Sequence, residues 1–232
     1  MKLLAFETAT EACSVALWID GEVRERFELA PRRHAELSLP WAEQLLAEAG
    51  IRKSQLDAVA LGRGPGAFTG VRLAIAIAQG IALALDRPLL PVSTLAALAL
   101  QAQGTRVLAS IDARMGEVYA AAYELRDGDT FAIGDELLAA PDAVALPDEA
   151  SGWHGVGTGF AASDGALPRR LAARFDHIDA GALPRAADVA RLAVKAWERG
   201  EAIEAERVEP AYLRNNVALT SAEQQALRAS RQ

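Results

Sequence analysis

One arrangement of strands and turns occurs twice in the sequence, once near its start and once near its middle. Each copy is an apolar strand ending in an acidic residue, a polar turn, a second strand, an Asp-Gly turn and a third strand. Asp-Gly is a favoured two-residue hairpin turn, so each copy predicts a three-stranded antiparallel meander. The copies are Lys2–Glu7, Cys13–Ile19, Asp20-Gly21 and Glu22–Leu29, then Val107–Asp112, Glu117–Leu125, Asp127-Gly128 and Thr130–Leu138. We interpret them as an internal duplication of one half-domain.

Two helices and two strands follow the first meander. Pro40 lies inside the first predicted helix and is expected to kink it or to split off its first turn. Thr69 is the predicted N-cap of the second helix. The apolar run Val71–Leu85 is shorter than the ~20 residues that a bilayer needs, so we expect a buried core helix. The predicted order is β-β-β-α-β-α-β, with the later elements at His34–Ala49, Asp57–Leu61, Gly70–Leu85 and Leu89–Val92.

Length and charge narrow the class of protein. The chain has 232 residues, a net charge of −7 and one cysteine. That length is ample for a core, and the single cysteine excludes an internal disulfide. Proteins that hold nucleic acid unaided carry basic faces, so the negative net charge of this chain argues against that role. We expect an α/β protein of two units, residues 1–103 and 104–232, in the cytoplasm and without a signal peptide or membrane span. The helix-prone segment 218–232 is expected to fray or to pack back on the first unit.

The sharpest local motif is the glycine-rich stretch Gly62–Gly70 before the second helix. Glycines allow close backbone approach, and a helix N-terminus attracts phosphate or carboxylate. A tight strand-to-helix turn without a ligand explains the same spacing equally well, and the lysine of a Walker loop is absent. An acid followed by a hydroxyl at the first turn, Glu7-Thr8, could orient magnesium or a phosphate, but a turn held by local hydrogen bonds is favoured. The residues expected near an anion or nucleotide are Glu7, Thr8, Gly64, Gly66, Thr69 and Gly70.

Other polar residues give weaker signals. Asp112 and Arg114 occupy the equivalent turn of the second copy, where a structural ion pair is favoured. The stretch Gly155–Gly159 has the wrong spacing for a dinucleotide loop. Cys13 opens an apolar strand and is expected to be a core thiol. The histidines have no second ligand at metal-binding spacing, and they are His34, His154 and His177. The residues therefore predict no catalytic group and no metal site.

Four motifs follow one another along nearly the whole chain. They are Leu4–Thr10 (LAFETAT), Gly62–Arg72 (GRGPGAFTGVR), Ile111–Tyr119 (IDARMGEVY) and Glu209–Asn216 (EPAYLRNN). In this combination the sequence resembles the TsaB (YeaZ) family, with Ala67 where that family often has serine. The resemblance implies an actin/hexokinase/Hsp70-like (ASKHA) fold of two β-β-β-α-β-α-β halves, the second of them degenerate.

The resemblance also implies a subunit without catalytic residues. The related TsaD transfers a threonylcarbamoyl group to the adenosine beside the tRNA anticodon, and the TsaB family activates TsaD in a complex with the ATPase TsaE. TsaD holds its metal with a His-x-x-x-His pair. Thr94 and Leu98 stand at the matching positions here, and neither can replace imidazole. No metal, peptidase activity or resident cofactor is expected, and ATP or ADP at a partner interface is left open.

The two helices of the first half are the predicted partner surface. Alanine-rich helices allow close approach, and aromatic anchors supply binding energy. We expect TsaD to bind there, TsaE to join the complex, the isolated chain to form a homodimer through the same face, and tRNA to be contacted only indirectly. The expected interface residues are His34, Leu37, Trp41, Leu45, Arg72, Ile75 and Gln79.

An alternative function is that of an autonomous ATP-binding phosphotransferase of the same fold. The Gly62–Gly70 loop and Glu7-Thr8 motivate it. The chain length argues against it, because little of the chain is left for the insertions that close such clefts. Titration with MgATP separates the two hypotheses.

Overall fold

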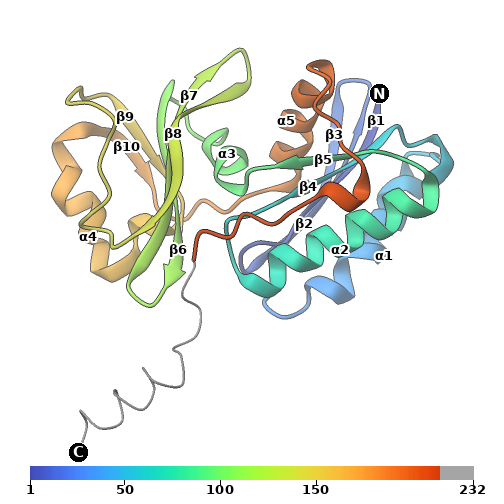
Figure 1. Cartoon of the computed structure of the whole chain (residues 1–232), viewed down its shortest axis with the longest axis horizontal. Coiled ribbons are helices and arrows are strands. Elements are labelled where there is room, and N and C mark those ends of the chain that lie inside the picture. Colours follow the sequence, from blue (N-terminus) through green and yellow to red (C-terminus); the bar gives the residue numbers. More distant parts are fainter. Residues whose placement is uncertain (215–232) are drawn as a thin grey trace, which may run out of the picture.

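Two five-stranded mixed sheets form the framework of the molecule in a computed structural model, which describes residues 1–214 (Figure 1). The first sheet has the order β3-β2-β1-β4-β5 and the second β10-β9-β6-β7-β8. The strands of the first sheet are β1 (Lys2–Glu7), β2 (Ala12–Ile19), β3 (Glu22–Leu29), β4 (Ala58–Gly62) and β5 (Leu89–Val92). Those of the second are β6 (Arg106–Arg114), β7 (Glu117–Arg126), β8 (Asp129–Ala139), β9 (Trp153–Val156) and β10 (Phe175–Asp179). The helices are α1 (His34–Glu48), α2 (Phe68–Leu85), α3 (Thr94–Ala99), α4 (Ala162–Leu171) and α5 (Ala186–Glu198).

Both predicted meanders are present, and each contains the tight hairpin turn that its Asp-Gly pair predicts. Asp20 and Gly21 have φ values of 47° and 104°, and Asp127 and Gly128 have 52° and 71°. Two successive positive φ values give the tight turn that matches the twist of antiparallel strands, and Asp-Gly tolerates them. The first strand of each meander, β1 or β6, lies at the centre of its sheet. The duplication inferred from the sequence is therefore present in the fold.

The two halves differ after their third strand. The first half follows the predicted β-β-β-α-β-α-β order, and α3, which the sequence analysis did not identify, comes after it. In the second half the described chain passes from β8 to β9 through residues 140–152 without a helix, and continues with α4, β10 and α5. The second half is therefore the degenerate copy, as expected, and the helix it lacks is the counterpart of α1.

The structure bears on two local predictions about the helices. Pro40 does not split off the first turn of α1, which is continuous from His34 to Glu48, and the alternative expectation of a kink stays a prediction. The carbonyl that loses its partner to the proline is that of Glu36, an exposed residue that water can satisfy. Thr69 is not the N-cap of α2, because that helix starts at Phe68, two residues earlier than predicted, with Ala67 at the cap position. The backbone N–H of Ala67 donates to the carbonyl oxygen of Ala9 at 2.7 Å, and this contact fixes where the helix begins.

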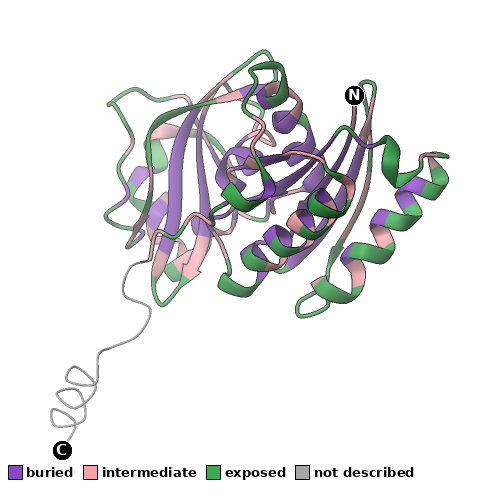
Figure 2. Cartoon of the chain, turned by 45° about the vertical axis from the view of Figure 1, so that its right-hand side comes forward, coloured by how far each residue is buried: buried purple, intermediate pink, exposed green. Residues whose placement is uncertain are grey.

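Helix α2 is only partly a core helix. Its 18 residues have a mean hydropathy of 1.7, so by length and composition it is apolar enough to cross a membrane, yet only 33% of it is buried. The buried side includes Val71, Ala74 and Ala78 and packs on the first sheet. Figure 2 shows the outer sides of α1 and α2 largely exposed. An apolar helix with a large exposed side is typical of a contact surface.

Helix α5 belongs to the second half of the sequence but begins on the first sheet. The Glu25 carboxylate on β3 accepts hydrogen bonds from the backbone N–H of Ala187 at 3.0 Å and from Nε of Arg185 at 3.0 Å. The N–H of Ala186 donates to the hydroxyl of Ser14 at 2.9 Å. One core cluster accordingly joins side chains of both sheets with α3 and α5. The helix predicted over 218–232 lies outside the described residues.

Candidate functional site

The glycine-rich loop packs tightly against the turn after β1. A Cβ atom added to Gly62 would lie 1.9 Å from Oε2 of Glu7, and one added to Gly70 would lie 1.9 Å from the carbonyl oxygen of Thr8. At Gly66 the same atom would lie 2.5 Å from the carbonyl oxygen of Ala9. Real Cβ atoms essentially never come so close to an oxygen. Gly66 and Gly70 require glycine because two backbone segments touch there, whereas at Gly62 the close neighbour is the buried side chain of Glu7.

Several polar groups of this loop are already paired in hydrogen bonds within the protein. The N–H of Gly64 donates to Oγ1 of Thr94 at 3.2 Å, and the hydroxyl of Thr8 donates to the carbonyl oxygen of Gly70 at 2.7 Å. Of the six residues predicted to lie near an anion, four are buried: Glu7, Thr8, Gly64 and Gly70. Gly66 is half-buried, and Thr69 is exposed on the first turn of α2. The tight-turn alternative thus accounts for the glycines, and anion binding stays a prediction.

Glu7 is a buried carboxyl group at the centre of this contact. It is 1% exposed, its Oε1 accepts from the N–H of Ala9 at 2.7 Å, and its Oε2 accepts from Oγ1 of Thr94 at 3.0 Å. Burial disfavours the charged form and raises the pKa of Glu7 to about 7, although these hydrogen bonds oppose the shift. Near neutral pH this carboxyl is therefore partly protonated.

The raised pKa of Glu7 predicts a pH-dependent stability. The folded chain binds the proton more tightly than the unfolded chain, so the stabilisation is complete below pH 4.5 and is lost as the pH rises through about 7. Glu7→Gln mimics the protonated form and removes this dependence. Relative to the wild type, the variant should gain about 3 kcal/mol of unfolding free energy between pH 4.5 and pH 8. Urea unfolding at both pH values measures it, and parallel pH profiles would contradict the assignment.

The positions that would carry a His-x-x-x-His pair are built into the core. Thr94 is the first residue of α3 and is fully buried, with its hydroxyl donating to Glu7. Leu98, one helical turn later, is also fully buried. Among residues 1–214 no group of three or more His, Cys, Asp or Glu side chains lies close enough to hold a metal ion.

The second glycine-rich stretch is also explained by packing. A Cβ atom on Gly157 would lie 2.2 Å from the carbonyl oxygen of Ser110, and one on Gly159 would lie 2.0 Å from its Oγ. The turn at Asp112 and Arg114 forms the predicted ion pair, with 2.8 Å between Oδ2 and Nη1. The turn at Asp112 and Arg114 lines a pocket of about 260 Å³ together with Ala9 and Gly66 of the first half.

The predicted interface residues divide into three groups. Leu45 is fully buried and Ile75 is 7% exposed, so these two side chains belong to the core and are not available to a partner in this conformation. The reason is that α1 and α2 turn those positions towards the first sheet, which sequence periodicity alone could not distinguish from the outer side. His34 and Gln79 bond within the chain, to the carbonyl oxygens of Thr10 at 2.9 Å and Ala205 at 2.8 Å.

The third group lies at the surface. Leu37 and Trp41 on α1 are half-buried, and Arg72 on α2 is exposed. The guanidinium carbon of Arg72 lies 3.2 Å from the ring centroid of Phe68, and Phe68 is itself 58% exposed. An arginine stacked on an exposed aromatic ring is typical of residues that anchor protein contacts.

Sequence reasoning missed a stripe along α2. Its residues follow one another in steps of four, are all exposed, and become small towards the end of the helix. We name this set the α2 stripe, and its members are Phe68, Arg72, Ala76, Gly80 and Ala84. Residues four apart share one helix face, so the spacing was the signal that could have found it. Small residues in such a row allow another helix to approach closely.

Between α1 and α2 lies a small apolar cavity of about 160 Å³. Leu39, Leu46 and Ile81 are among its lining residues, and the ion pair of Glu43 with Lys53 at 2.8 Å also borders it. Leu39 is 48% exposed. The exposed sides of α1 and α2, with this cavity and the α2 stripe, are called the two-helix face below.

Comparisons of the chain with known proteins find relatives that agree with one another. A family model described as "TsaD: tRNA N6-adenosine threonylcarbamoyltransferase" matches residues 28–222. The chain is 45% identical to the tRNA threonylcarbamoyladenosine biosynthesis protein TsaB of Escherichia coli over 94% of this chain and 96% of that protein. It is 39% identical to the TsaB protein of Haemophilus influenzae, over 94% and 95% of the two chains. The solved structure of YeaZ from Pseudomonas aeruginosa is similar at 47% identity and a TM-score of 0.83, covering 91% of this chain and 99% of that one.

Proposed function

The chain belongs to the TsaB family of tRNA threonylcarbamoyladenosine biosynthesis proteins, and we propose that it acts in that pathway as a non-catalytic subunit that binds and activates the transferase TsaD. The observation that carries the proposal is the two-helix face. It exposes much of α2, an apolar helix whose 18 residues have a mean hydropathy of 1.7 and are only 33% buried. A partner that covers this side removes that apolar surface from water.

The nature of the partner follows from the family relationship. Because the TsaD family model matches most of this chain, TsaD is expected to have helices equivalent to α1 and α2. Two subunits of one fold offer similar faces, and small residues on both allow their helices to pack closely. The same reasoning predicts a homodimer of the isolated chain through the two-helix face. TsaD competes for this face when it is present.

The non-catalytic role rests on the filled metal position. Thr94 and Leu98 are buried where the transferase would need imidazole ligands, and both are held by contacts of the core. The subunit therefore works by contact, stabilising one conformation of its partner's catalytic cleft. We further propose that TsaE joins this pair, that tRNA is held mainly by the partners, and that the complex acts in the cytoplasm.

A binding and activity assay tests the proposal. The chain is mixed with TsaD of the same organism and followed by size-exclusion chromatography with light scattering, and threonylcarbamoyl transfer to tRNA is measured with ATP-dependent substrate supply and TsaE. We expect a stable heterodimer and transfer that depends on adding the chain. Absence of both would refute the proposal.

The same preparation tests the alternative function. Calorimetric titration of the isolated chain with MgATP, followed by a phosphate-release assay, reports autonomous nucleotide binding and hydrolysis. Micromolar binding with turnover by the chain alone would favour a phosphotransferase over a contact subunit.

A further inference from the structure

The chain that follows α5 crosses the first half as an extended segment, residues 201–214, which we call the strap (Figure 1). It begins beside the edge strand β5, where the backbones of Ile203 and Leu89 exchange two hydrogen bonds of 2.8 and 2.9 Å. It continues along α2, where the side chain of Gln79 donates to the carbonyl oxygen of Ala205 at 2.8 Å. The strap therefore lies next to the helix that carries the α2 stripe.

Tyr212 stands on the strap beside the start of α2. The centroid of its ring lies 6.3 Å from that of Phe68, with 29° between the ring planes, and Tyr212 is 51% exposed. Contacts on both sides of Tyr212 hold the strap here. The N–H of Ala211 donates to the carbonyl oxygen of Arg63 at 2.9 Å, and Arg214 forms an ion pair with the second half. An exposed ring on a backbone that is already fixed loses little conformational freedom when a partner covers it.

The guanidinium of Arg72 lies over both rings. Its carbon is 3.2 Å from the ring centroid of Phe68 and 5.0 Å from that of Tyr212. At the shorter distance the flat face of the guanidinium contacts the ring, and its five N–H donors lie in the plane, at its edge. We name these three residues the anchor cluster. Stacking satisfies the face of the guanidinium but supplies no acceptor to its donors.

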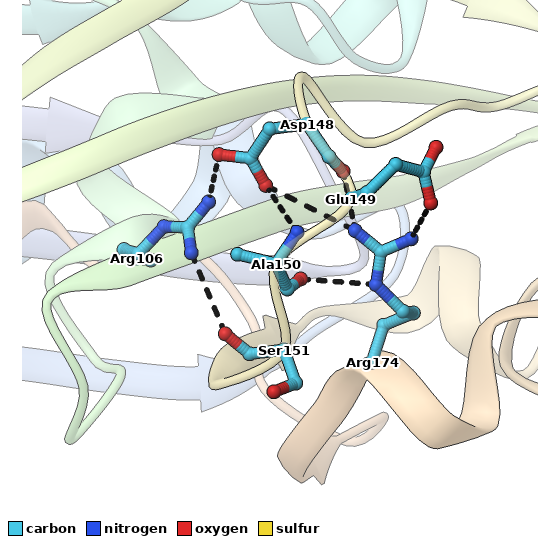
Figure 3. Close-up of polar contacts among 6 residues, drawn as sticks. All are labelled: Arg106, Asp148, Glu149, Ala150, Ser151 and Arg174. Atoms are coloured by element: carbon cyan, nitrogen blue, oxygen red, sulfur yellow. Dashed lines mark hydrogen bonds and ion pairs between the residues drawn. The ribbon is translucent and has the colours of Figure 1, made fainter.

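Three other arginines in residues 1–214 also stack on aromatic rings, and each of them pairs with a carboxylate. Figure 3 shows one such pair, Arg106 with Asp148. The other two pairs are Arg126 with Glu124 at 2.9 Å and Arg185 with Glu25 at 3.0 Å. Arg72 differs, because no carboxylate among residues 1–214 pairs with it. In this fold a stacked arginine is otherwise completed by a carboxylate, which indicates the group that suits Arg72.

The rest of α2 makes such a group necessary once the helix is covered. Arg72 is the one charged residue among the 18 of α2, and it is a member of the α2 stripe. A partner that covers the stripe takes the guanidinium out of water, and a buried charge without a counter-charge is costly. Nucleic acid does not fit this helix, since a phosphate backbone is held by several cations. The counter-charge therefore has to come from a protein partner.

We propose that the anchor cluster binds a carboxylate side chain of TsaD, with Arg72 donating to both carboxylate oxygens while Phe68 and Tyr212 pack against that side chain. A stacked, planar guanidinium is already oriented for two parallel hydrogen bonds. The inference rests on the proposed function and deepens it, because it gives the chemistry of the partner group and makes the strap part of the binding surface.

Calorimetric titration of the full-length chain with TsaD of the same organism, in the absence of tRNA, tests the proposal. Arg72→Ala removes the donors, and Arg72→Lys keeps the charge without the planar fork. Tyr212→Ala removes the ring on the strap, and Tyr212→Phe restores it. The matched control is Phe131→Ala, which removes another exposed ring that carries a stacked arginine. The melting temperature of each variant checks its fold.

We expect Arg72→Ala to weaken binding to TsaD by about 30-fold and Tyr212→Ala by about tenfold, as for anchor residues at the centre of a contact. Arg72→Lys should bind more like Arg72→Ala than like the wild type, because an ammonium cannot make the bidentate, stacked contact. Tyr212→Phe and Phe131→Ala should bind like the wild type.

The results that overturn the inference differ from those that overturn the proposed function. Wild-type affinity for TsaD in both Arg72→Ala and Tyr212→Ala overturns the inference alone, whereas a wild-type chain that does not bind TsaD overturns both. Full affinity of Arg72→Lys also overturns the bidentate contact. A loss that appears only when tRNA is added, or only in the homodimer of the chain, would assign the anchor cluster to nucleic acid or to a second copy and would equally overturn the inference.

Discussion

Replacing Gly70 by alanine is expected to destabilise the folded chain by about 3 kcal/mol or more, because the new methyl group would lie 1.9 Å from the carbonyl oxygen of Thr8. That oxygen belongs to the backbone and cannot move away as a side chain can. Relief requires a shift of α2 or of the turn after β1, and either shift would loosen Glu7 and its hydrogen bonds. Urea unfolding of the two proteins at one pH gives the difference.

Gly80 in the same helix provides the matched control. A Cβ atom there would meet nothing within 4 Å. Since alanine favours the helical state over glycine, Gly80→Ala should stabilise the free chain by about 0.5–1 kcal/mol. Equal effects at the two positions would show that contact with Thr8 is not the reason for a glycine at 70. A loss that added phosphate or nucleotide reverses would instead support the anion site.

The second large effect is expected at the two-helix face. Gly80→Leu should leave the free subunit folded, since leucine is a good helix former and the position is open. It should weaken binding to TsaD by about 100-fold, because a large side chain in the middle of the α2 stripe holds the two helices apart. Calorimetric titration measures the affinity, and the melting temperature of the variant checks its fold.

Two comparisons make that result specific. Ala173→Leu places the same side chain on an exposed position of the second half and should bind TsaD like the wild type. Gly80→Ala should have a smaller effect on binding than Gly80→Leu, since the effect scales with side-chain volume. Unchanged affinity for Gly80→Leu would place the partner elsewhere and would refute the role of the α2 stripe.

Much of the framework could be predicted from local pattern. The Asp-Gly turns and the alternation along Glu22–Leu29 determine two meanders, because hairpin geometry and strand period are local properties. The order of elements in the first half follows in the same way. The short helix α3 was missed, since Thr94–Ala99 is a brief apolar run without a period that separates a helix from a strand.

The candidate site was predicted less completely, for reasons that lie in the tertiary structure. Leu45 and Ile75 fit an apolar stripe, but only the packed sheet shows that this stripe faces inward. The glycines of Gly62–Gly70 fit both a phosphate loop and a tight turn, because both need backbone approach. Their distances to Glu7, Thr8 and Ala9 explain the glycines without a ligand.

By itself the sequence determined the duplication, the hairpins, the family resemblance and the absence of imidazole at the positions of Thr94 and Leu98. Each of these depends on residue type and spacing along the chain. Only the tertiary structure decided that Glu7 is buried with a raised pKa, that Glu25 on β3 binds the start of α5, and that Tyr212 stacks on Phe68 at the start of α2. These features depend on contacts between residues far apart in sequence, and burial and charge pairing are properties of the packed chain.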